Sequence, residues 1–371
     1  MHFLDRKHNL GLLNSISEEI IHCPSCQGEI EVSAITAGSQ IICPYCNHQF
    51  ASFKFFGHYR LQRLLGEGGM GSVYEALDTK LNRLVAIKVL KAGLSHDKKF
   101  SATFLREVEI TASLSHPNIV QVFSFGEHNN QYYLVMELIG HYTLDHEINK
   151  RKRMTEAEVI DIGIGVASGL QFALEKGNLI HRDIKPGNIL LSNSRVPKVV
   201  DFGLALTPET AEESTGEVWG TPYYVSPERL EGVTEDFRSD MYSLGMTLYH
   251  TLAGRPAFEA TTAELVAMMH ITDQPLPLQT YVPSISEQAS YAIMRAMARD
   301  PEKRFQSYHE FISQLEDAKR RLASPVAAPS RTVIAQPEAD NKQMLMVIGI
   351  GVAIVVIGVV GFIAYRMFNA I

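Results

Sequence analysis

Two charged side chains within apolar runs constrain how the middle of the sequence can fold. Lys88 ends the strand-like run Val85-Ala86-Ile87-Lys88, and Asp201 follows directly after the mostly apolar residues 196–200. A lysine inside an apolar strand costs free energy unless it meets an opposite charge. A solvated position on an edge strand is the plainer alternative for Lys88. The surrounding sequence must therefore decide whether Lys88 has an acidic partner.

Further motifs occur around these residues in a fixed order. They are Gly66-Glu67-Gly68-Gly69-Met70-Gly71 between the strand-like runs 59–65 and 72–78, then His181-Arg182-Asp183-Ile184-Lys185-Pro186-Gly187-Asn188, then Asp201-Phe202-Gly203. A glycine-rich turn by itself also fits an ordinary β-hairpin. Taken together and in this order, residues 59–322 resemble a bacterial (Hanks-type) serine/threonine protein kinase.

This resemblance implies how ATP would be bound. The glycine-rich segment would fold over the nucleotide, because glycines let backbone N–H groups approach phosphates closely. Lys88 would hold the α- and β-phosphates and pair with Glu107, nineteen residues further on, with Glu109 as the less favoured alternative. The implied contacts to the base are Val73, Ala86, Leu190, the gatekeeper Met136, and the hinge residues Glu137 and Leu138.

The resemblance also assigns the chemistry. Asp183 would orient the substrate hydroxyl and accept its proton, and Lys185 would steady the γ-phosphate. Asn188 and Asp201 would bind magnesium (or manganese), which neutralises the charge that develops during transfer.

The resemblance and the sequence predict several structural features as well. Glu228 of the Ser-Pro-Glu motif is expected to pair with Arg304, and Asp240 to brace the catalytic loop. Capping boxes, Thr155 with Glu158 and Ser307 with Glu310, predict the starts of two helices. The first helix should extend to about residue 176 and the second to about residue 321.

All four cysteines lie near the N-terminus, in two Cys-x-x-Cys pairs: Cys23 with Cys26, and Cys43 with Cys46. Sixteen residues separate the pairs, and this spacing is typical of a tetrahedral zinc site with four thiolates. The residues between them suggest a strand, a turn and a strand. Residues 21–57 therefore resemble a zinc ribbon with structural zinc, in which His22 and His48 would not take part.

Two other readings of the cysteines remain. Cys43-Pro-Tyr-Cys46 is also the redox sequence of glutaredoxins, although that fold needs a larger scaffold and one motif. A disulfide framework would need an oxidising compartment, and residues 1–20 show no signal peptide. Zinc ribbons also bind nucleic acid, but residues 21–57 hold one lysine, Lys54, and no arginine. Nucleic acid is therefore an unfavoured partner.

The C-terminal region predicts a membrane anchor. Residues 344–365 contain no charged side chain, and 22 residues of helix span about 33 Å, enough to cross a bilayer core. A buried globular helix is the weaker alternative. Residues 323–342 are rich in Ala, Pro and Ser and predict a flexible linker. The spacing of Gly349 and Ala353 would permit a homodimer of spans.

The segment between the Asp-Phe-Gly and Ser-Pro-Glu motifs suggests regulation. It contains Thr215 and Ser214, which we expect to be autophosphorylation sites, Thr215 first. A phosphate adds about −2 charge and would pair with Arg182 beside Asp183. An unmodified polar loop is the alternative.

Together these features predict an α+β chain with a bilobal protein kinase fold, a β-rich N-lobe and a helical C-lobe. The predicted parts are an N-terminal segment (1–20), a zinc-ribbon-like module (21–57), a kinase domain (58–322), a linker (323–342), a transmembrane helix (343–366) and a short tail (367–371). The expected activity is phosphate transfer from ATP to Ser or Thr of cytosolic proteins. The kinase domain would lie on the cytoplasmic side of the cell membrane, anchored by a single span.

Two rival functions are a pseudokinase scaffold and a zinc-dependent nucleic-acid adaptor. The complete set of catalytic residues argues against the first. The low basic content of the cysteine region and the net charge of −7 argue against the second.

Overall fold

The computed structural model describes residues 20–31, 40–51, 54–69, 71–91, 108–109, 111–128, 130–140, 142–202 and 222–323. The chain divides into two compact units, Met1–Ser324 and Pro325–Ile371, and all described residues belong to the first. Several predictions fall outside the described residues: Met70, Glu107, Gly203, Ser214, Thr215, most of the linker and the membrane helix.

The cysteine region forms two small antiparallel hairpins. Strand β1 (Ile20–His22) pairs with β2 (Glu29–Glu31), and β3 (Gln40–Ile42) pairs with β4 (Gln49–Ala51). The strands expected on both sides of the central turn are present as β2 and β3. Each of them pairs across its own Cys-x-x-Cys turn, so both halves repeat one structure.

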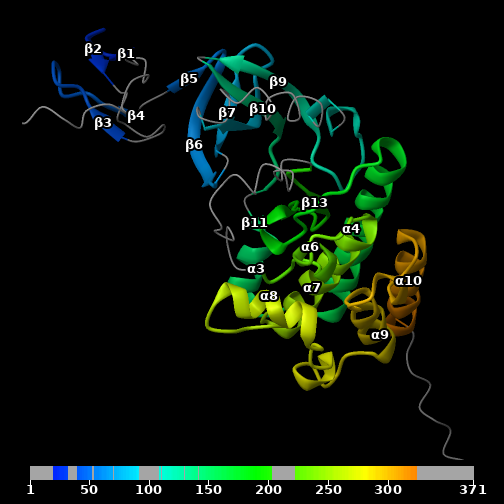
Figure 1. The fold of residues 1–371 in the computed structure, drawn as a ribbon. Helices are drawn as coiled ribbons and strands as arrows, with labels where there is room; N and C mark the ends of the chain where they lie inside the picture. Colours follow the sequence, from blue (N-terminus) through cyan, green and yellow to red (C-terminus); the bar gives the residue numbers. More distant parts are fainter. Residues whose placement is uncertain are drawn as a thin grey trace, which may run out of the picture. The chain divides into compact units, whose positions relative to one another are not determined.

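A six-stranded antiparallel sheet follows, in the order β5-β6-β7-β8-β10-β9 (Figure 1). Its strands are β5 (Lys54–Phe56), β6 (Tyr59–Glu67), β7 (Gly71–Asp78), β8 (Arg83–Leu90), β9 (Val122–His128) and β10 (Gln131–Glu137). Strands β6 and β7 confirm the two runs predicted around the glycine-rich segment. Strand β5, within the predicted cysteine module, pairs with β6 and so belongs to this sheet.

Alternation along β8 decides the position of Lys88. Val85 and Ile87 pack on one face of the sheet, whereas Ala86 and Leu90 pack in a separate cluster. Successive side chains of a strand point to opposite faces, so Lys88 shares the face of Ala86. Because β8 lies between β7 and β10 and Lys88 is 6% exposed, the edge-strand alternative is wrong.

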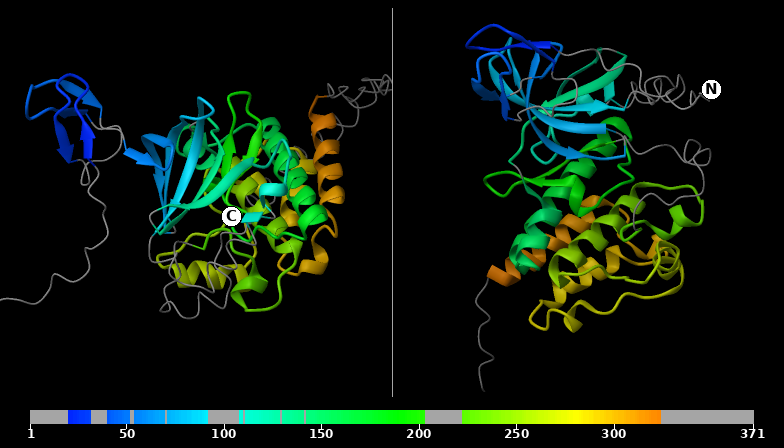
Figure 2. Two further views of the ribbon diagram at one scale, coloured as in Figure 1. Left: turned by 90° about the horizontal axis from the view of Figure 1, so that it is seen from above. Right: turned by 90° about the vertical axis from the view of Figure 1, so that its left-hand side faces the viewer.

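The remaining part is mainly helical (Figure 2). Its elements are the strands β11 (Tyr142–Thr143), β12 (Ile189–Leu191) and β13 (Pro197–Val199), the helices α3 (Leu144–Arg151), α4 (Glu156–Gly177), α6 (Pro227–Leu230), α7 (Phe237–Ala253), α8 (Ala263–Thr272), α9 (Glu287–Ala296) and α10 (Tyr308–Ala323), and the short 3-10 turns η1 (Pro186–Asn188), η2 (Leu278–Thr280) and η3 (Pro301–Lys303). Helix α7 is buried along most of its length.

Helices α4, α7 and α10 pack closely at one point. A Cβ atom on Gly163 of α4 would lie 2.9 Å from side-chain atoms of both Leu248 of α7 and Leu315 of α10. Only glycine fits without displacing these residues. Among the described helices, α4 alone is long and apolar enough to cross a bilayer, and half of its apolar window is buried inside the structure.

The two predicted capping boxes differ in outcome. The Thr155 side chain accepts the Glu158 N–H, and the Glu158 carboxylate accepts the Thr155 N–H, so the first box is confirmed. At α10 the Ser307 hydroxyl accepts the Glu310 N–H, but the Glu310 carboxylate accepts the N–H of Gln306. The second box is therefore only half formed, because its glutamate reaches one residue further back.

A buried histidine makes the helical part sensitive to acid. His270 of α8 is 1% exposed, and its Nδ1 lies 2.7 Å from the Tyr242 hydroxyl. Burial lowers the pKa of His270 to about 4, against an ordinary value of 6.5. As pH falls through this interval, the unfolded chain binds the proton before the folded chain does. Acidification therefore lowers the free energy of unfolding.

We predict that acidification from pH 7 to pH 4 removes about 2–3 kcal/mol of stability through His270. Its replacement by asparagine, which keeps an acceptor near Tyr242, should flatten the dependence of unfolding free energy on pH. Urea denaturation at a series of pH values measures this slope. The exposed His309→Asn variant should match the wild type, and parallel curves for His270→Asn and wild type would contradict the assignment.

Candidate active site

Lys88 meets its opposite charge at the end of another strand. Its Nζ lies 2.8 Å from Oδ1 of Asp201, and the Lys88 side chain is 8% exposed. Asp201 has a φ of +62°, which costs an ordinary L-residue roughly 1–2 kcal/mol. The surrounding structure thus holds Asp201 in a strained conformation that directs its carboxylate to the lysine. The expected partner Glu107 lies outside the described residues.

The predicted base contacts come together in one apolar cluster. Ala86 and Met136 are buried neighbours on the paired strands β8 and β10. Val73 of β7, Leu138 of the hinge and Leu190 of β12 pack against the same cluster. These residues come from four separate segments of the chain. The cluster therefore offers an apolar surface beside Lys88, as a flat base requires.

The glycine-rich segment forms the tight turn between β6 and β7. The Gly68 N–H donates to the Gly71 carbonyl at 2.9 Å, and Gly66, Glu67, Gly68 and Gly69 are exposed. A Cβ atom on Gly71 would lie 2.2 Å from the Val89 carbonyl oxygen, so any larger residue would push β7 away from β8. This exposed turn lacks bulky side chains at its glycines, so a ligand can approach its backbone closely.

The predicted catalytic residues form a connected group. Lys185 Nζ lies 2.8 Å from Asp183 Oδ2, and the Asn188 amide donates at 2.8 Å to the same oxygen and to the Asp183 carbonyl. The amide nitrogen of Asn188 is thus committed to Asp183. Its carbonyl oxygen is left for another ligand.

A buried carboxylate fixes the loop that carries Asp183. Asp240 of α7 accepts the N–H of His181 at 2.6 Å and the N–H of Arg182 at 2.7 Å, which confirms its predicted bracing role. Burial raises the pKa of Asp240, and these N–H donors oppose that shift. His181 Nε2 lies 2.8 Å from the carbonyl of Val200, the residue before Asp201. One network therefore positions both Asp183 and Asp201.

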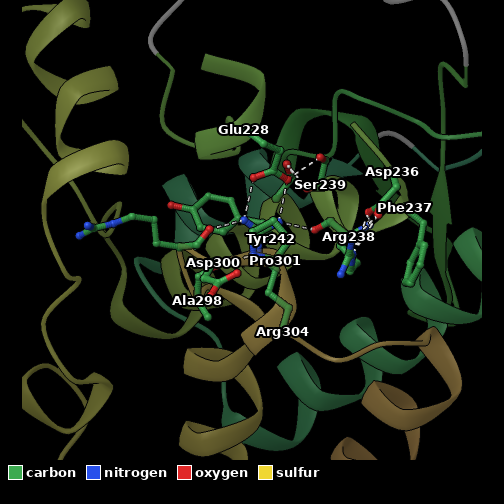
Figure 3. Close-up of polar contacts among 12 residues, drawn as sticks. Glu228, Asp236, Phe237, Arg238, Ser239, Tyr242, Ala298, Asp300, Pro301 and Arg304 are labelled. Atoms are coloured by element: carbon green, nitrogen blue, oxygen red, sulfur yellow. Dashed lines mark hydrogen bonds and ion pairs between the residues drawn. The ribbon is translucent and has the colours of Figure 1, made fainter. Parts of the chain in front are cut away.

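The predicted pair of Glu228 and Arg304 is present and buried (Figure 3). Arg304 Nη1 and Nη2 donate to the two Glu228 oxygens at 2.7 and 2.8 Å. The other Arg304 donors reach the carbonyls of Ala298, Arg238 and Arg299. Burial acts to raise the pKa of Glu228, but Arg304 outweighs burial and brings that pKa below its ordinary value.

The four cysteines converge on one point. Their sulfur atoms all lie within 4.8 Å of one another, and Cys23 to Cys46 and Cys26 to Cys43 are each 3.6 Å apart. None of the four forms a disulfide in the structure. Ser25 and Tyr45 donate backbone N–H groups to Cys23 and Cys43, each at 3.4 Å. Four converging sulfurs, two of them with backbone N–H donors, fit a tetrahedral metal site.

Comparison with known proteins agrees with this geometry. The protein kinase domain family matches residues 59–315. The chain belongs to the protein kinase family. It is 36% identical to a probable serine/threonine-protein kinase of Clostridium perfringens (79% of this chain, 42% of the relative) and 37% identical to the serine/threonine-protein kinase PknB of Mycobacterium tuberculosis (69% and 42%).

A solved structure shares the kinase fold. The crystal structure of the Mycobacterium tuberculosis PknI kinase domain matches with a TM-score of 0.59 and 30% identity, covering 72% of this chain and 98% of that one. The chain spans about two fifths of the length of the curated relatives it matches. These relatives place the kinase domain among the bacterial serine/threonine kinases.

One site contact of this kinase domain was not predicted. Lys198 of β13 lies 2.7 Å from Glu137 Oε1, and the same oxygen accepts the Gln121 N–H at 2.8 Å. The contact fixes the hinge residue Glu137 to the strand that leads to Asp201. A lysine within the mostly apolar residues 196–200 was the available signal, and it follows the same logic as Lys88.

We predict that Arg304→Gln lowers the free energy of unfolding by about 3–5 kcal/mol, because it leaves the Glu228 carboxylate buried without its cation. The exposed pair of Arg321 and Asp317 provides the control, and Arg321→Gln should cost less than about 1 kcal/mol. Urea denaturation of both variants measures the difference. Equal losses of unfolding free energy in the two variants would show that burial does not increase the contribution of the Glu228 and Arg304 pair to stability.

Proposed function

We propose that this protein transfers the γ-phosphate of ATP to serine or threonine hydroxyls of other proteins. The observation that carries this proposal is that His181 connects two clusters of charged and polar side chains through hydrogen bonds to Asp183 and Val200. The first cluster is the ion pair of Lys88 and Asp201, and the second is Asp183 with Lys185 and Asn188. The family membership and the serine/threonine kinases among its relatives support the same activity.

The geometry gives each residue a task. Lys88 presents a desolvated positive charge for the α- and β-phosphates, and the apolar cluster around Ala86 and Met136 receives the base. Asp183 receives the acceptor hydroxyl and its proton, while Lys185, 2.8 Å from that carboxylate, lies ready for the γ-phosphate.

The residues present fit a magnesium ion. The free carbonyl oxygen of Asn188 and the carboxylate of Asp201, 31% exposed, are oxygen donors of the kind that magnesium prefers. When bound, magnesium supplies positive charge against the phosphates of the nucleotide.

We predict that the full-length chain, given ATP and Mg²⁺, phosphorylates casein on serine or threonine. Asp183→Asn should lower kcat about 100-fold or more with little change in nucleotide affinity, because only the acceptor of the proton is lost. Incorporation of labelled phosphate and binding of a fluorescent nucleotide measure the two effects. Asp161→Asn, an exposed change on α4, is the control.

A pseudokinase gives a different result. It binds the nucleotide, and it transfers no phosphate to casein or to itself at any concentration of magnesium or manganese.

The proposal extends to regulation and location. Arg182 lies beside Asp183, and its Nε has no hydrogen-bond partner within the described part of the chain. This supports autophosphorylation at Thr215, or at its neighbour Ser214, as the source of an anionic partner. The uncharged residues 344–365 support a single-pass membrane anchor with the kinase domain on the cytoplasmic side, and Gly349 supports pairing of two spans.

We also propose that the cysteine cluster binds one structural zinc ion, because four free sulfurs meet and fill a tetrahedron. Purified protein should contain about one zinc per chain, and Cys43→Ser should remove most of it. Elemental analysis measures the metal. Ser25→Ala, which retains the backbone donor to Cys23, should keep the full content. Thiol titration showing two disulfides and no metal would favour the redox alternative.

A further inference from the structure

A cavity of about 430 Å³ opens beside the catalytic loop and extends beyond the residues that the mechanism uses. Asp183 and Lys185 line one part of it. Asp145 of α3, Tyr224 and His250 of α7 line another part, which we call the Asp145 corner. The Asp145 corner lies in the same cavity as Asp183. A protein substrate whose acceptor hydroxyl is at Asp183 would therefore have its neighbouring residues close to this corner.

Tyr224 and His250 form a neutral pair in this corner. The Tyr224 hydroxyl lies 2.7 Å from His250 Nδ1, and the two rings are nearly parallel. Burial raises the pKa of Tyr224 well above its ordinary value, so the phenol keeps its proton and is a hydrogen-bond donor available to Nδ1. Burial also lowers the pKa of His250, against the opposing fields of Asp145 and Glu259. The pair therefore adds no positive charge to the corner.

Asp145 contributes a negative charge to the corner. It is exposed, and its Oδ2 accepts the Asn149 amide at 3.0 Å. Its field adds to the rise in the pKa of Tyr224 and opposes the lowering of the pKa of His250 by burial, so it acts on the same space. An amide donor leaves the charge of the carboxylate in place.

Each of the other carboxylates that line the described part of the cavity is either paired or more deeply buried than Asp145. Asp183 faces Lys185 at 2.8 Å. Glu235 Oε1 lies 4.0 Å from Arg229, its Oε2 has no hydrogen-bond partner within the described residues, and burial raises the pKa of Glu235. Asp240 accepts two backbone N–H groups. Within the described residues, Asp145 is the lining carboxylate that has neither a cation within 4 Å nor a pair of backbone donors.

We propose that the Asp145 corner seats a lysine or arginine side chain of the protein substrate, close in sequence to the phosphorylated residue. The inference rests on the proposed kinase activity and adds the substrate class. The aromatic rings of Tyr223 and Tyr224 provide a surface for the aliphatic stem of such a side chain, while its charged end reaches Asp145. An acidic substrate side chain would instead be repelled by Asp145.

The test uses the full-length chain, ATP and Mg²⁺ with a positional-scanning library of peptides that carry one central serine. At one flanking position, lysine and arginine should exceed leucine by about fivefold in kcat/KM, the scale of one partly exposed ion pair. Asp145→Asn should reduce this ratio below about twofold. Asp145→Lys should favour glutamate and aspartate at the same position.

The control and the contrary outcomes separate this inference from the proposed activity. Glu287→Gln removes another exposed carboxylate from the first turn of a helix, α9, and should leave the preference unchanged. Phosphorylation without a basic preference, or a basic preference that survives Asp145→Lys, overturns the inference while the kinase activity stands.

A binding assay decides the matter if no peptide is phosphorylated, a result that would contradict the activity itself. Fluorescein-labelled peptides with alanine in place of serine, with and without one arginine, are titrated with wild-type and Asp145→Asn protein. Tighter binding of the arginine peptide by the wild type alone supports the corner as a cation site. Equal binding of both peptides overturns it.

Discussion

The buried ion pair between Lys88 and Asp201 is the interaction on which the arrangement of the site depends. Lys88 lies on a central strand with little access to water, so its charge must be met within the protein or by a ligand. Asp201 reaches it only because the strand β13 and the carbonyl of Val200 are held in place by Asn118 and His181. The pair thus joins the six-stranded sheet to the catalytic loop and creates a position where phosphates and a metal ion are both favourable.

Rigid surroundings hold two residues at this site in strained backbone conformations. Arg182 and Asp201 both have positive φ values, which glycine adopts more readily than other residues. Asp240, on the largely buried helix α7, compensates by accepting the backbone N–H groups of His181 and Arg182. The Glu228 and Arg304 pair braces the start of the same helix through Ser239 and the Arg238 carbonyl. The catalytic loop therefore derives its geometry from the helical core rather than from its own residues.

The sequence predicted features that depend on short spacing or on a familiar motif. The strands beside the glycine-rich turn, the Thr155 capping box, the convergence of the cysteines and the partners of Glu228 and Asp240 were all predicted correctly. The sequence did not predict the pairing partners of β2 and β3, which are β1 and β4, because hydrogen-bond pairing depends on which segments meet in space and not on their order. The contact of Glu310 with Gln306 was missed for a related reason, since a one-residue change in the reach of a side chain leaves no trace in the spacing. The roles of the site residues themselves stay predictions.

Contacts between distant residues that belong to no familiar motif were the least predictable from sequence. Lys198 with Glu137 and Tyr224 with His250 are separated by 61 and 26 residues, and each member looks ordinary in its own segment. The role of the Tyr224 and His250 contact can be inferred only when each charge lining the cavity beside Asp183 has been assigned to a partner. Around this cavity Glu228 is matched by Arg304, Asp183 by Lys185 and Asp240 by backbone donors. Asp145 differs from these carboxylates because it is exposed and has no cation within 4 Å among the described residues, so its charge is available to another molecule.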